Sequence, residues 1–221
     1  MIPYKDDNPI HIIPLVTILI IALNILVFIM QLFSGEDSAS IAYSYGAIPH
    51  NIISLTSSQP IPPALTIFTS MFMHGGLFHI AWNMLYFWIF GNNIEERLGH
   101  IRFIFFYLFC GVIAALSHAL LSPNSNVPMI GASGAVSGML GAYLLLFPMA
   151  KIRTIVFLGF YITVIQIPAL IVIGFWAIIQ VVSGLISQGN AAQGGIAFFA
   201  HVGGFAAGLI TIKLWQPRRL R

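Results

Sequence analysis

Residues 129–138, MIGASGAVSG, place Ser133 among glycines and alanines at the mouth of an apolar segment. Small residues recur there every three or four positions, a pattern typical of membrane helices that pack closely. Close packing explains the glycines, but an ordinary membrane helix has no need of a small exposed hydroxyl at this place. We therefore expect another helix or a substrate to come very close to Ser133.

The composition indicates a polytopic membrane protein. Apolar residues make up 58% of the 221 positions and charged residues 7%, whereas a soluble domain has about a quarter of its residues charged. The net charge of +3 could suggest a nucleic-acid partner, but the placement of the charges argues against it. The single Cys110 leaves neither a disulfide nor a thiolate metal site. We predict one domain, 1–221, without a clear internal repeat.

Helices that span a bilayer need about 20 mostly apolar residues. The predicted spans cover approximately residues 10–33, 64–90, 101–121, 131–147, 169–186 and 196–215. The apolar run 154–186 is longer than one span and is broken at Pro168. Its first part, 154–167, could therefore be a further span or a segment at the interface.

The positions of the lysines and arginines decide between these alternatives. With six spans, all nine basic residues fall on one side, and the loops 34–63, 122–130 and 187–195 on the other side contain none. A seventh span would place the C-terminal basic cluster opposite Lys151 and Arg153. We predict an all-α bundle of six transmembrane helices with both termini cytoplasmic and 154–167 in or against the interface.

Polar side chains within the predicted spans mark a candidate site, because such groups are costly at membrane depth. The second span contains His74, His79 and Asn83, the last two on one helical face. Ser133 lies on the fourth span and His201 on the sixth. The predicted topology brings all five residues into the outer half of the membrane.

Each of these features also has a purely structural interpretation. The pairs Gly134/Gly138 and Gly204/Gly208 by themselves indicate only close helix packing. A membrane histidine can simply donate to a backbone carbonyl, and we assign that role or an interface position to His11, His50, His100 and His118. The two interpretations are compatible, since close packing of the fourth and sixth helices would place His201 against Ser133.

The chemistry that fits these residues is nucleophilic catalysis by a Ser–His dyad. A serine hydroxyl needs a base to take its proton, and histidine is the usual one. All six carboxylates lie outside the apolar spans, so no acid is available to complete a triad. The Asn83 amide, an N–H of His79 and backbone amides at the start of the fourth helix could stabilise an oxyanion.

Other membrane chemistries fit less well. The chain has no His-Glu-x-x-His for a zinc peptidase and no aspartate within a span for an aspartyl dyad. Histidines could bind a metal or line a proton or ammonia path, but Ser133 and its glycines would then be unexplained.

Taken together, the motifs resemble those of the rhomboid intramembrane serine proteases over residues 64–212. The motifs that carry the resemblance are GASG at 131–134, HVGGFAAG at 201–208, HGGLFHIAWN at 74–83 and EERLG at 95–99. Each is weak alone, but in this order and on these spans they are highly specific.

The resemblance implies roles for the motif residues and requires neither a metal nor another cofactor. Ser133 would be the nucleophile and His201 the general base. His79, Asn83 and the Ser133 backbone N–H would form the oxyanion hole. Residues that would support the site are His74, near a water-filled entrance, and Gly131, Gly134 and Gly204. Residues that would be structural are Glu95 and Arg97, which hold the cytoplasmic loop after the second span, and Gly138 and Gly208.

The resemblance also implies a fourth helix that starts below the membrane surface. The loop 34–63 would be partly embedded in the outer leaflet, and the fifth span with the loop 187–195 would form a gate and cap. The chain departs from many members in two places. The loop 34–63 lacks a Trp-Arg pair, and Ser137 stands where some members have a tyrosine that stacks on the histidine, so closer packing or another aromatic must orient His201.

The expected function is cleavage of transmembrane protein substrates near the outer membrane face. The alternative is a rhomboid-like, non-catalytic binder of membrane helices, and a histidine-lined transporter comes third, because no inverted repeat is evident. The bilayer and membrane proteins are the expected partners, with no nucleic acid. The simplest location is the plasma (inner) membrane of a prokaryote.

Overall fold

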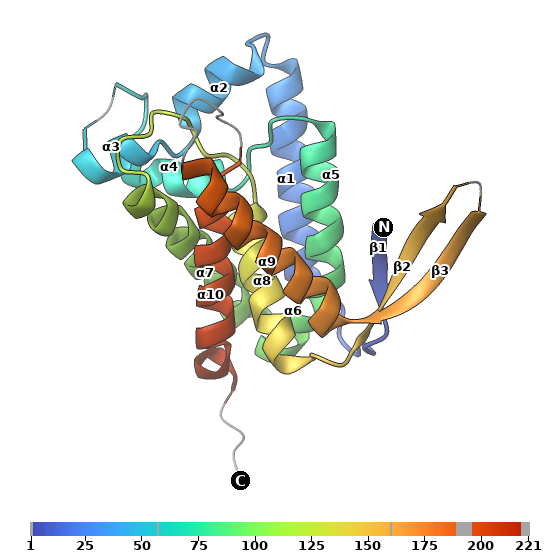
Figure 1. The fold of residues 1–221 in the computed structure, drawn as a ribbon. Coiled ribbons are helices and arrows are strands. Elements are labelled where there is room, and N and C mark those ends of the chain that lie inside the picture. Colours follow the sequence, from blue (N-terminus) through green and yellow to red (C-terminus); the bar gives the residue numbers. More distant parts are fainter. Residues whose placement is uncertain (1, 57, 160, 189–195, 218–221) are drawn as a thin grey trace.

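The apolar runs of the sequence form a helical bundle with a small sheet attached at one end (Figure 1). The structure is a computed structural model that describes residues 2–56, 58–159, 161–188 and 196–217. Four helices in this part of the chain are apolar and long enough to cross a membrane: α1 (Leu15–Phe33), α7 (His100–Leu121), α9 (Ala169–Gln188) and α10 (Phe198–Trp215). A shorter apolar helix, α8 (Ser133–Leu146), lies among them.

Helices α7, α8, α9 and α10 lie where the apolar segments predicted helices. The first helix starts at Leu15, five residues later than predicted, and Pro14 is its N-cap residue. Proline has no N–H to contribute to a helical hydrogen bond and is tolerated at a helix start.

The second predicted span, 64–90, does not form one helix, and this prediction is wrong in its bounds. Helix α4 (Pro63–Ser70) is followed by a non-helical segment that contains Gly75 and Gly76. A continuous helical run then joins α5 (Leu77–Tyr86), the π-helical turn η1 (Phe87–Gly91) and α6 (Asn92–Leu98). It ends at Gly99, whose φ of +75° is a conformation that glycine adopts at little cost.

The fold is mostly helical rather than all-α, because residues 151–168 form a β-hairpin instead of an interfacial loop. Strand β2 (Lys151–Leu158) pairs antiparallel with β3 (Tyr161–Pro168), and the N-terminal strand β1 (Ile2–Asp6) pairs with β2. Both strands of the hairpin are rich in isoleucine, valine and threonine, which favour strands, and Gly159 adopts a φ of +64° at the turn. In Figure 1 the hairpin projects from the bundle and leads directly into α9.

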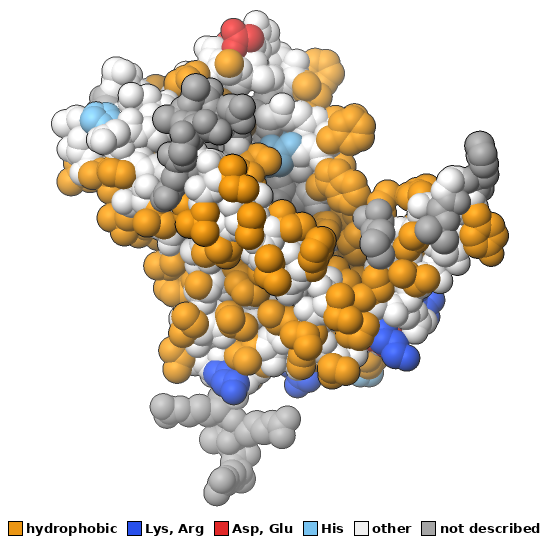
Figure 2. All heavy atoms as spheres, viewed as in Figure 1, with side chains coloured by type: hydrophobic (Ala, Val, Ile, Leu, Met, Phe, Trp, Pro, Cys, Tyr) orange, Lys and Arg blue, Asp and Glu red, His pale blue; other side chains and the backbone are white. Residues whose placement is uncertain are grey.

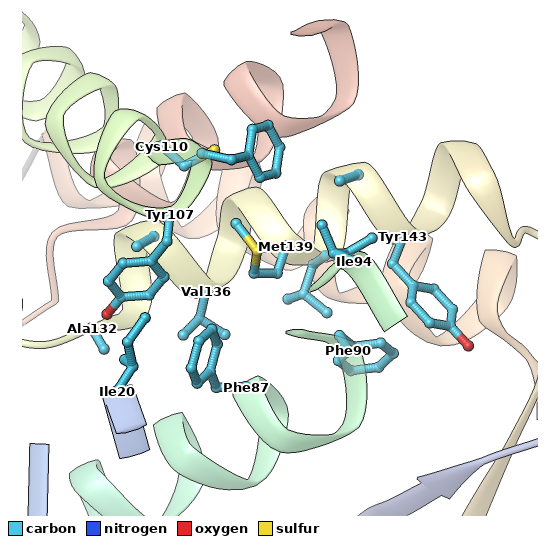
Figure 3. Packing of buried hydrophobic residues seen from close by; sticks show 14 of the residues in the cluster. Ile20, Phe87, Phe90, Ile94, Tyr107, Cys110, Ala132, Val136, Met139 and Tyr143 are labelled. Atoms are coloured by element: carbon cyan, nitrogen blue, oxygen red, sulfur yellow. The ribbon is translucent and has the colours of Figure 1, made fainter. Parts of the chain in front are cut away.

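Helix α8 lies at the centre of the bundle. Every residue from Gly134 to Tyr143 is buried, so this short helix is covered by protein on all sides. Figure 3 shows Val136 and Met139 of α8 packing between Phe87 of η1 and the α7 residues Tyr107 and Cys110. The burial explains the apolar character of α8 all around its circumference.

The loop 34–63, which lacks the Trp-Arg pair, is held by other contacts. It contains α2 (Ser38–Tyr45) and α3 (Pro49–Ser54). The Gln59 amide donates to the carbonyl oxygens of Tyr43 and Gly46, both at 2.9 Å. Ala47 and Met129 exchange two backbone hydrogen bonds of 3.0 and 2.8 Å. The last contact joins this loop to the segment that precedes Ser133.

The surface separates apolar and basic side chains. Figure 2 shows hydrophobic side chains over the middle of the face on which α9 and α10 lie, and Lys and Arg side chains near the end where α10 terminates. Lys213 lies in the last turn of α10, and Lys151 begins β2 at the same end of the bundle.

Candidate active site

The first residue of α8 and a histidine of α10 meet directly. The Oγ atom of Ser133 lies 2.8 Å from Nε2 of His201. Both side chains are partly buried. The two residues are 68 positions apart in the sequence, so only the packing of α8 against α10 brings them together.

The backbone before α8 holds Ser133 at the helix start. Gly131 has a φ of +122°, which side-chain-bearing residues rarely adopt, and its N–H donates to the Ser70 carbonyl at 2.8 Å. The helix begins at Ser133, so its first N–H groups have no intrahelical acceptors. These free donors lie where an anionic oxygen beside Ser133 would be favoured.

His79 and Asn83 of α5 lie beside the start of α8, next to Gly131. Gly75 N–H donates to His79 Nδ1 at 3.3 Å, so Nδ1 is an acceptor and the ring proton of the neutral imidazole is on Nε2. A Cβ atom at Gly131 would lie 2.8 Å from that Nε2 and 3.7 Å from Asn83 Nδ2. The absence of a side chain at Gly131 therefore leaves room for both donors beside the start of α8.

His74 does not occupy the predicted place near a water-filled entrance. It is 1% exposed, and its ring lies edge-on to the His79 ring at a centroid distance of 5.1 Å. Neither ring nitrogen has a hydrogen-bond partner among the described residues. Its backbone N–H and carbonyl bond the Gln31 amide of α1. His74 is thus a buried side chain that packs against the His79 ring.

A cavity of about 1210 Å³ opens onto the Ser–His pair. Its lining comes from helices α5, α7, α8, α9 and α10 and from the segment before α8, and it includes His79, Asn83, Ser133, Trp176 and His201. Such a volume accommodates an extended peptide segment better than a single small molecule. His118, for which we expected a backbone bond or an interface position, also lines this cavity.

Two residues of α9 that the sequence analysis missed contact His201. Gln180 Oε1 lies 2.7 Å from His201 Nδ1, and the Trp176 ring lies 6.1 Å from the imidazole with an interplanar angle of 37°. Of the two expected ways to orient His201, closer packing or another aromatic, the structure shows aromatic contacts, since Phe198 also lies edge-on to the imidazole at 6.5 Å. Ser137 itself donates to the Ser133 carbonyl at 2.6 Å. The sequence did contain a signal for Gln180, because a single amide side chain inside an apolar span is costly without a hydrogen-bond partner.

The glycine pairs lie at the contact between α8 and α10. A Cβ atom at Gly204 would collide with the Gly134 carbonyl oxygen, and one at Gly208 with the Gly138 carbonyl oxygen. The structure therefore brings these four residues together as the sequence pattern predicted. Gly138 also faces Cys110 of α7, so its lack of a side chain serves two contacts.

Glu95 and Arg97 lie at the opposite end of the bundle from the dyad. The fully buried Glu95 carboxylate accepts from Val16 N, Thr17 N and Thr17 Oγ1 at 2.7–2.8 Å, so it caps the N-terminus of α1. His100 Nδ1 lies 2.6 Å from the same carboxylate. We expected a backbone bond or an interface position for this histidine, and its side chain contacts Glu95. The Arg97 guanidinium lies over the Phe147 ring at 5.0 Å.

No group of three or more His, Cys, Asp or Glu side chains in the described part of the chain could hold a metal ion. The groups that the site itself presents are a hydroxyl, an imidazole and several N–H donors. Of the predicted cap 187–195, residues 189–195 lie outside the described residues.

Comparison with known proteins finds one family. The sequence model of the Rhomboid domain matches residues 63–217. The chain is similar to Rhomboid protease GluP of Bacillus subtilis (strain 168), with 32% identity over 132 residues, which are 59% of this chain and 24% of the relative. It is also similar to Rhomboid protein 1, mitochondrial, of Saccharomyces cerevisiae, with 31% identity over 179 residues, 76% of this chain and 48% of the relative. A third relative is RHOMBOID-like protein 1 of Arabidopsis thaliana, 29% identical over 144 residues, 65% of this chain and 32% of the relative. The chain thus spans less than half the length of these relatives.

Proposed function

The chain belongs to the rhomboid family, and from that premise we propose that it is an intramembrane serine endopeptidase with Ser133 as nucleophile and His201 as general base. The observation that carries this proposal is the 2.8 Å contact between Ser133 Oγ and His201 Nε2 beside the cavity. A hydroxyl and an imidazole at hydrogen-bond distance are the minimum that serine catalysis requires.

The first half of the reaction forms an acyl-enzyme. Ser133 Oγ attacks the carbonyl carbon of the scissile peptide, and its proton passes to His201 Nε2. The carbonyl oxygen becomes an oxyanion that the Ser133 N–H, the His79 Nε2–H and the Asn83 amide stabilise. As the C–N bond breaks, His201 returns the proton to the leaving amine, and the acyl group remains as an ester on Ser133.

The second half releases the other product. His201 accepts a proton from a water molecule, the resulting hydroxide attacks the ester carbonyl, and the proton returns to Ser133 Oγ as the ester bond breaks. No metal or other cofactor takes part in this proposal. The site needs water, and the cavity gives Ser133 access to it.

The proposed substrates are transmembrane segments cut near the outer membrane face. Helical backbone is already hydrogen-bonded, so a substrate must unwind locally before Ser133 can reach a carbonyl. Family resemblance implies helix-breaking residues in the substrate and a small side chain at the cut. We place the site in the outer half of the membrane, with six spans and both termini cytoplasmic. The basic side chains at the end of the bundle far from Ser133 support this orientation.

The protein is an integral membrane protein, and we propose the prokaryotic plasma membrane as its location. Relatives with mitochondrial names make an organelle membrane the competing location. Fractionation of the native host with antibody to the chain distinguishes these two sites.

The test is labelling of purified protein in detergent with a fluorophosphonate, which reacts with activated serines. Wild type and Ser137→Ala should be labelled, and mass spectrometry should locate the adduct on Ser133. Ser133→Ala and His201→Ala should lose labelling. If wild type stays unlabelled while an active rhomboid protease reacts in parallel, the enzyme hypothesis fails. Binding of transmembrane peptides without cleavage would then support the alternative, a non-catalytic binder of membrane helices.

A further inference from the structure

Helix α9 presents two side chains to the imidazole of His201. Gln180 and Trp176 are one helical turn apart and therefore lie on the same face of α9. Gln180 is 8% exposed, and its Oε1 lies 2.7 Å from Nδ1 of His201. A buried amide on an apolar helix is unfavourable unless it is hydrogen-bonded, so this contact accounts for the presence of glutamine at this position.

One tautomer of His201 satisfies both of its side-chain contacts. A carbonyl oxygen can only accept, so the contact with Gln180 Oε1 requires the ring proton on Nδ1. Nε2 then carries the lone pair and accepts from the Ser133 hydroxyl. This is the protonation pattern that a general base needs before it removes the proton of a serine.

No carboxylate performs this task in the described part of the structure. Of the acidic side chains, Glu95 caps α1 and Asp6 bonds Tyr143 and Asn93, both at the other end of the bundle. The histidines His79 of α5 and His118 of α7 line the same cavity as His201. The aromatic rings of Trp176 and Phe198 flank the imidazole, with no hydrogen-bond acceptor for Nδ1.

We propose that Gln180 is a positioning residue that holds His201 in the Nδ1–H tautomer and aims Nε2 at Ser133. This inference rests on the proposed serine-protease function. Gln180 would take the orienting part of the acid in a triad while remaining neutral, which suits a site in an apolar helix bundle. Because Gln180 belongs to α9, an outward movement of α9 would remove both this acceptor and Trp176 from the histidine.

The variants are chosen to separate positioning from folding. Gln180→Met removes the acceptor at nearly constant volume, and Gln180→Glu keeps an acceptor oxygen. Ile179→Met is the matched control, since its side chain is on the same helix and 41% exposed. Each variant is measured for thermal unfolding, for the rate of fluorophosphonate labelling between about pH 5 and 9, and for cleavage of one transmembrane substrate.

Gln180→Met should lower the labelling rate and kcat about five- to tenfold, with KM and the unfolding midpoint near those of wild type. Gln180→Glu should recover most of this loss. As the pH is lowered, the labelling of Gln180→Glu should begin to decline at a higher pH than that of wild type, because a carboxylate beside Nδ1–H stabilises the imidazolium. Ile179→Met should match wild type. The proposal is overturned if both Gln180 variants have the labelling rates and pH profiles of wild type. It is also overturned if the labelling rate of Gln180→Met falls together with its unfolding midpoint and Gln180→Glu does not recover the rate.

A second measurement does not depend on activity. Nitrogen NMR of protein labelled at histidine, with His201→Ala to assign the signal, should show a protonated Nδ1 and an unprotonated Nε2 in wild type. In Gln180→Met the two tautomers should mix. If wild type fails to react with fluorophosphonate but shows the single tautomer, the protease proposal fails while the Gln180 contact stands. If Gln180→Met shows the same single tautomer as wild type, the contact with Gln180 is not what holds His201 in that tautomer.

Discussion

At the scale of single residues, the site depends on where ring protons lie. The hydrogen-bond partners of His79 and His201 favour opposite tautomers: the N–H of Gly75 donates to Nδ1 of His79, whereas Nδ1 of His201 lies 2.7 Å from the acceptor oxygen Oε1 of Gln180. His79 can therefore donate from Nε2, whereas His201 can accept at Nε2. In the proposed mechanism two histidines therefore take different parts, His79 as a donor to the oxyanion and His201 as the base, because their hydrogen-bond partners differ.

The first prediction concerns His79. His79→Ala should lower kcat about a hundredfold or more, with a smaller change in KM, because a donor to the oxyanion is needed mainly in the transition state. Steady-state cleavage of a transmembrane substrate measures both constants. His50→Ala, an exposed histidine of α3 outside the cavity lining, should retain wild-type rates. Equal kcat for His79→Ala and wild type would remove His79 from the oxyanion hole.

At the scale of elements, the distance between α8 and α10 controls the dyad. Ser133 and His201 are in contact because glycines let these helices approach until backbone faces backbone. The same helices would be held further apart by larger residues, and the 2.8 Å contact between Oγ and Nε2 would be lost. The glycines therefore determine the helix spacing on which the Ser133–His201 contact depends.

Gly208 offers the direct test of this contact. Gly208→Val should place its Cβ against the Gly138 carbonyl, destabilise the fold by about 1–3 kcal/mol and reduce fluorophosphonate labelling more than tenfold. Unfolding in detergent and labelling rates measure the two effects. Gly174→Ala in α9 is the control, because a Cβ there meets no atom within 4 Å. Normal labelling in Gly208→Val would show that the dyad tolerates a wider helix spacing.

At the scale of the whole molecule, polar contacts remote from the dyad join the N-terminal segment to the bundle. The buried Asp6 Oδ2 accepts from Tyr143 Oη at 2.7 Å and from Asn93 Nδ2 at 2.9 Å, which links β1 to α8 and α6. Glu95 joins α6 to the start of α1. The N-terminal segment, α1, α6 and α8 are therefore connected at the end of the bundle opposite the cavity.

The Asp6 carboxyl predicts a pH dependence of stability. Burial raises the pKa of Asp6 above its ordinary value of 3.8. A raised folded-state pKa contributes stability that is complete below the ordinary pKa and is lost as the pH rises through the folded-state pKa. Between about pH 4 and 7, the unfolding midpoint of wild type should therefore fall relative to Asp6→Asn, whose amide oxygen accepts the same two bonds without charge.

Thermal unfolding in detergent across this pH range measures the difference. Glu36→Gln, an exposed carboxylate in the loop after α1, should follow wild type at every pH. If Asp6→Asn and wild type stay parallel from about pH 4 to 7, the buried Asp6 carboxyl does not control this part of the stability.

The residue pattern within single segments was enough to predict several helices, one helix–helix contact and part of the candidate site. Apolar runs predicted the positions of α7, α8, α9 and α10, since a helix in a membrane must be apolar over its length. Small residues spaced four apart predicted the contact of α8 with α10, and polar side chains within apolar spans pointed to Ser133, His79 and His201. These are properties of single segments, which one sequence reveals.

Other features depended on contacts between distant segments, which only the tertiary structure decided. Strand β1 forms because the N-terminal segment pairs with β2, about 150 residues later in the sequence. The burial of His74 behind His79 and the cap that Glu95 places on α1 likewise join separate helices. Gln180 was visible as a polar residue in α9, but its partner depended on how α9 rotates and packs against α10. The identity of a side chain limits what it can bond, and the packing of the helices determines which partner it meets.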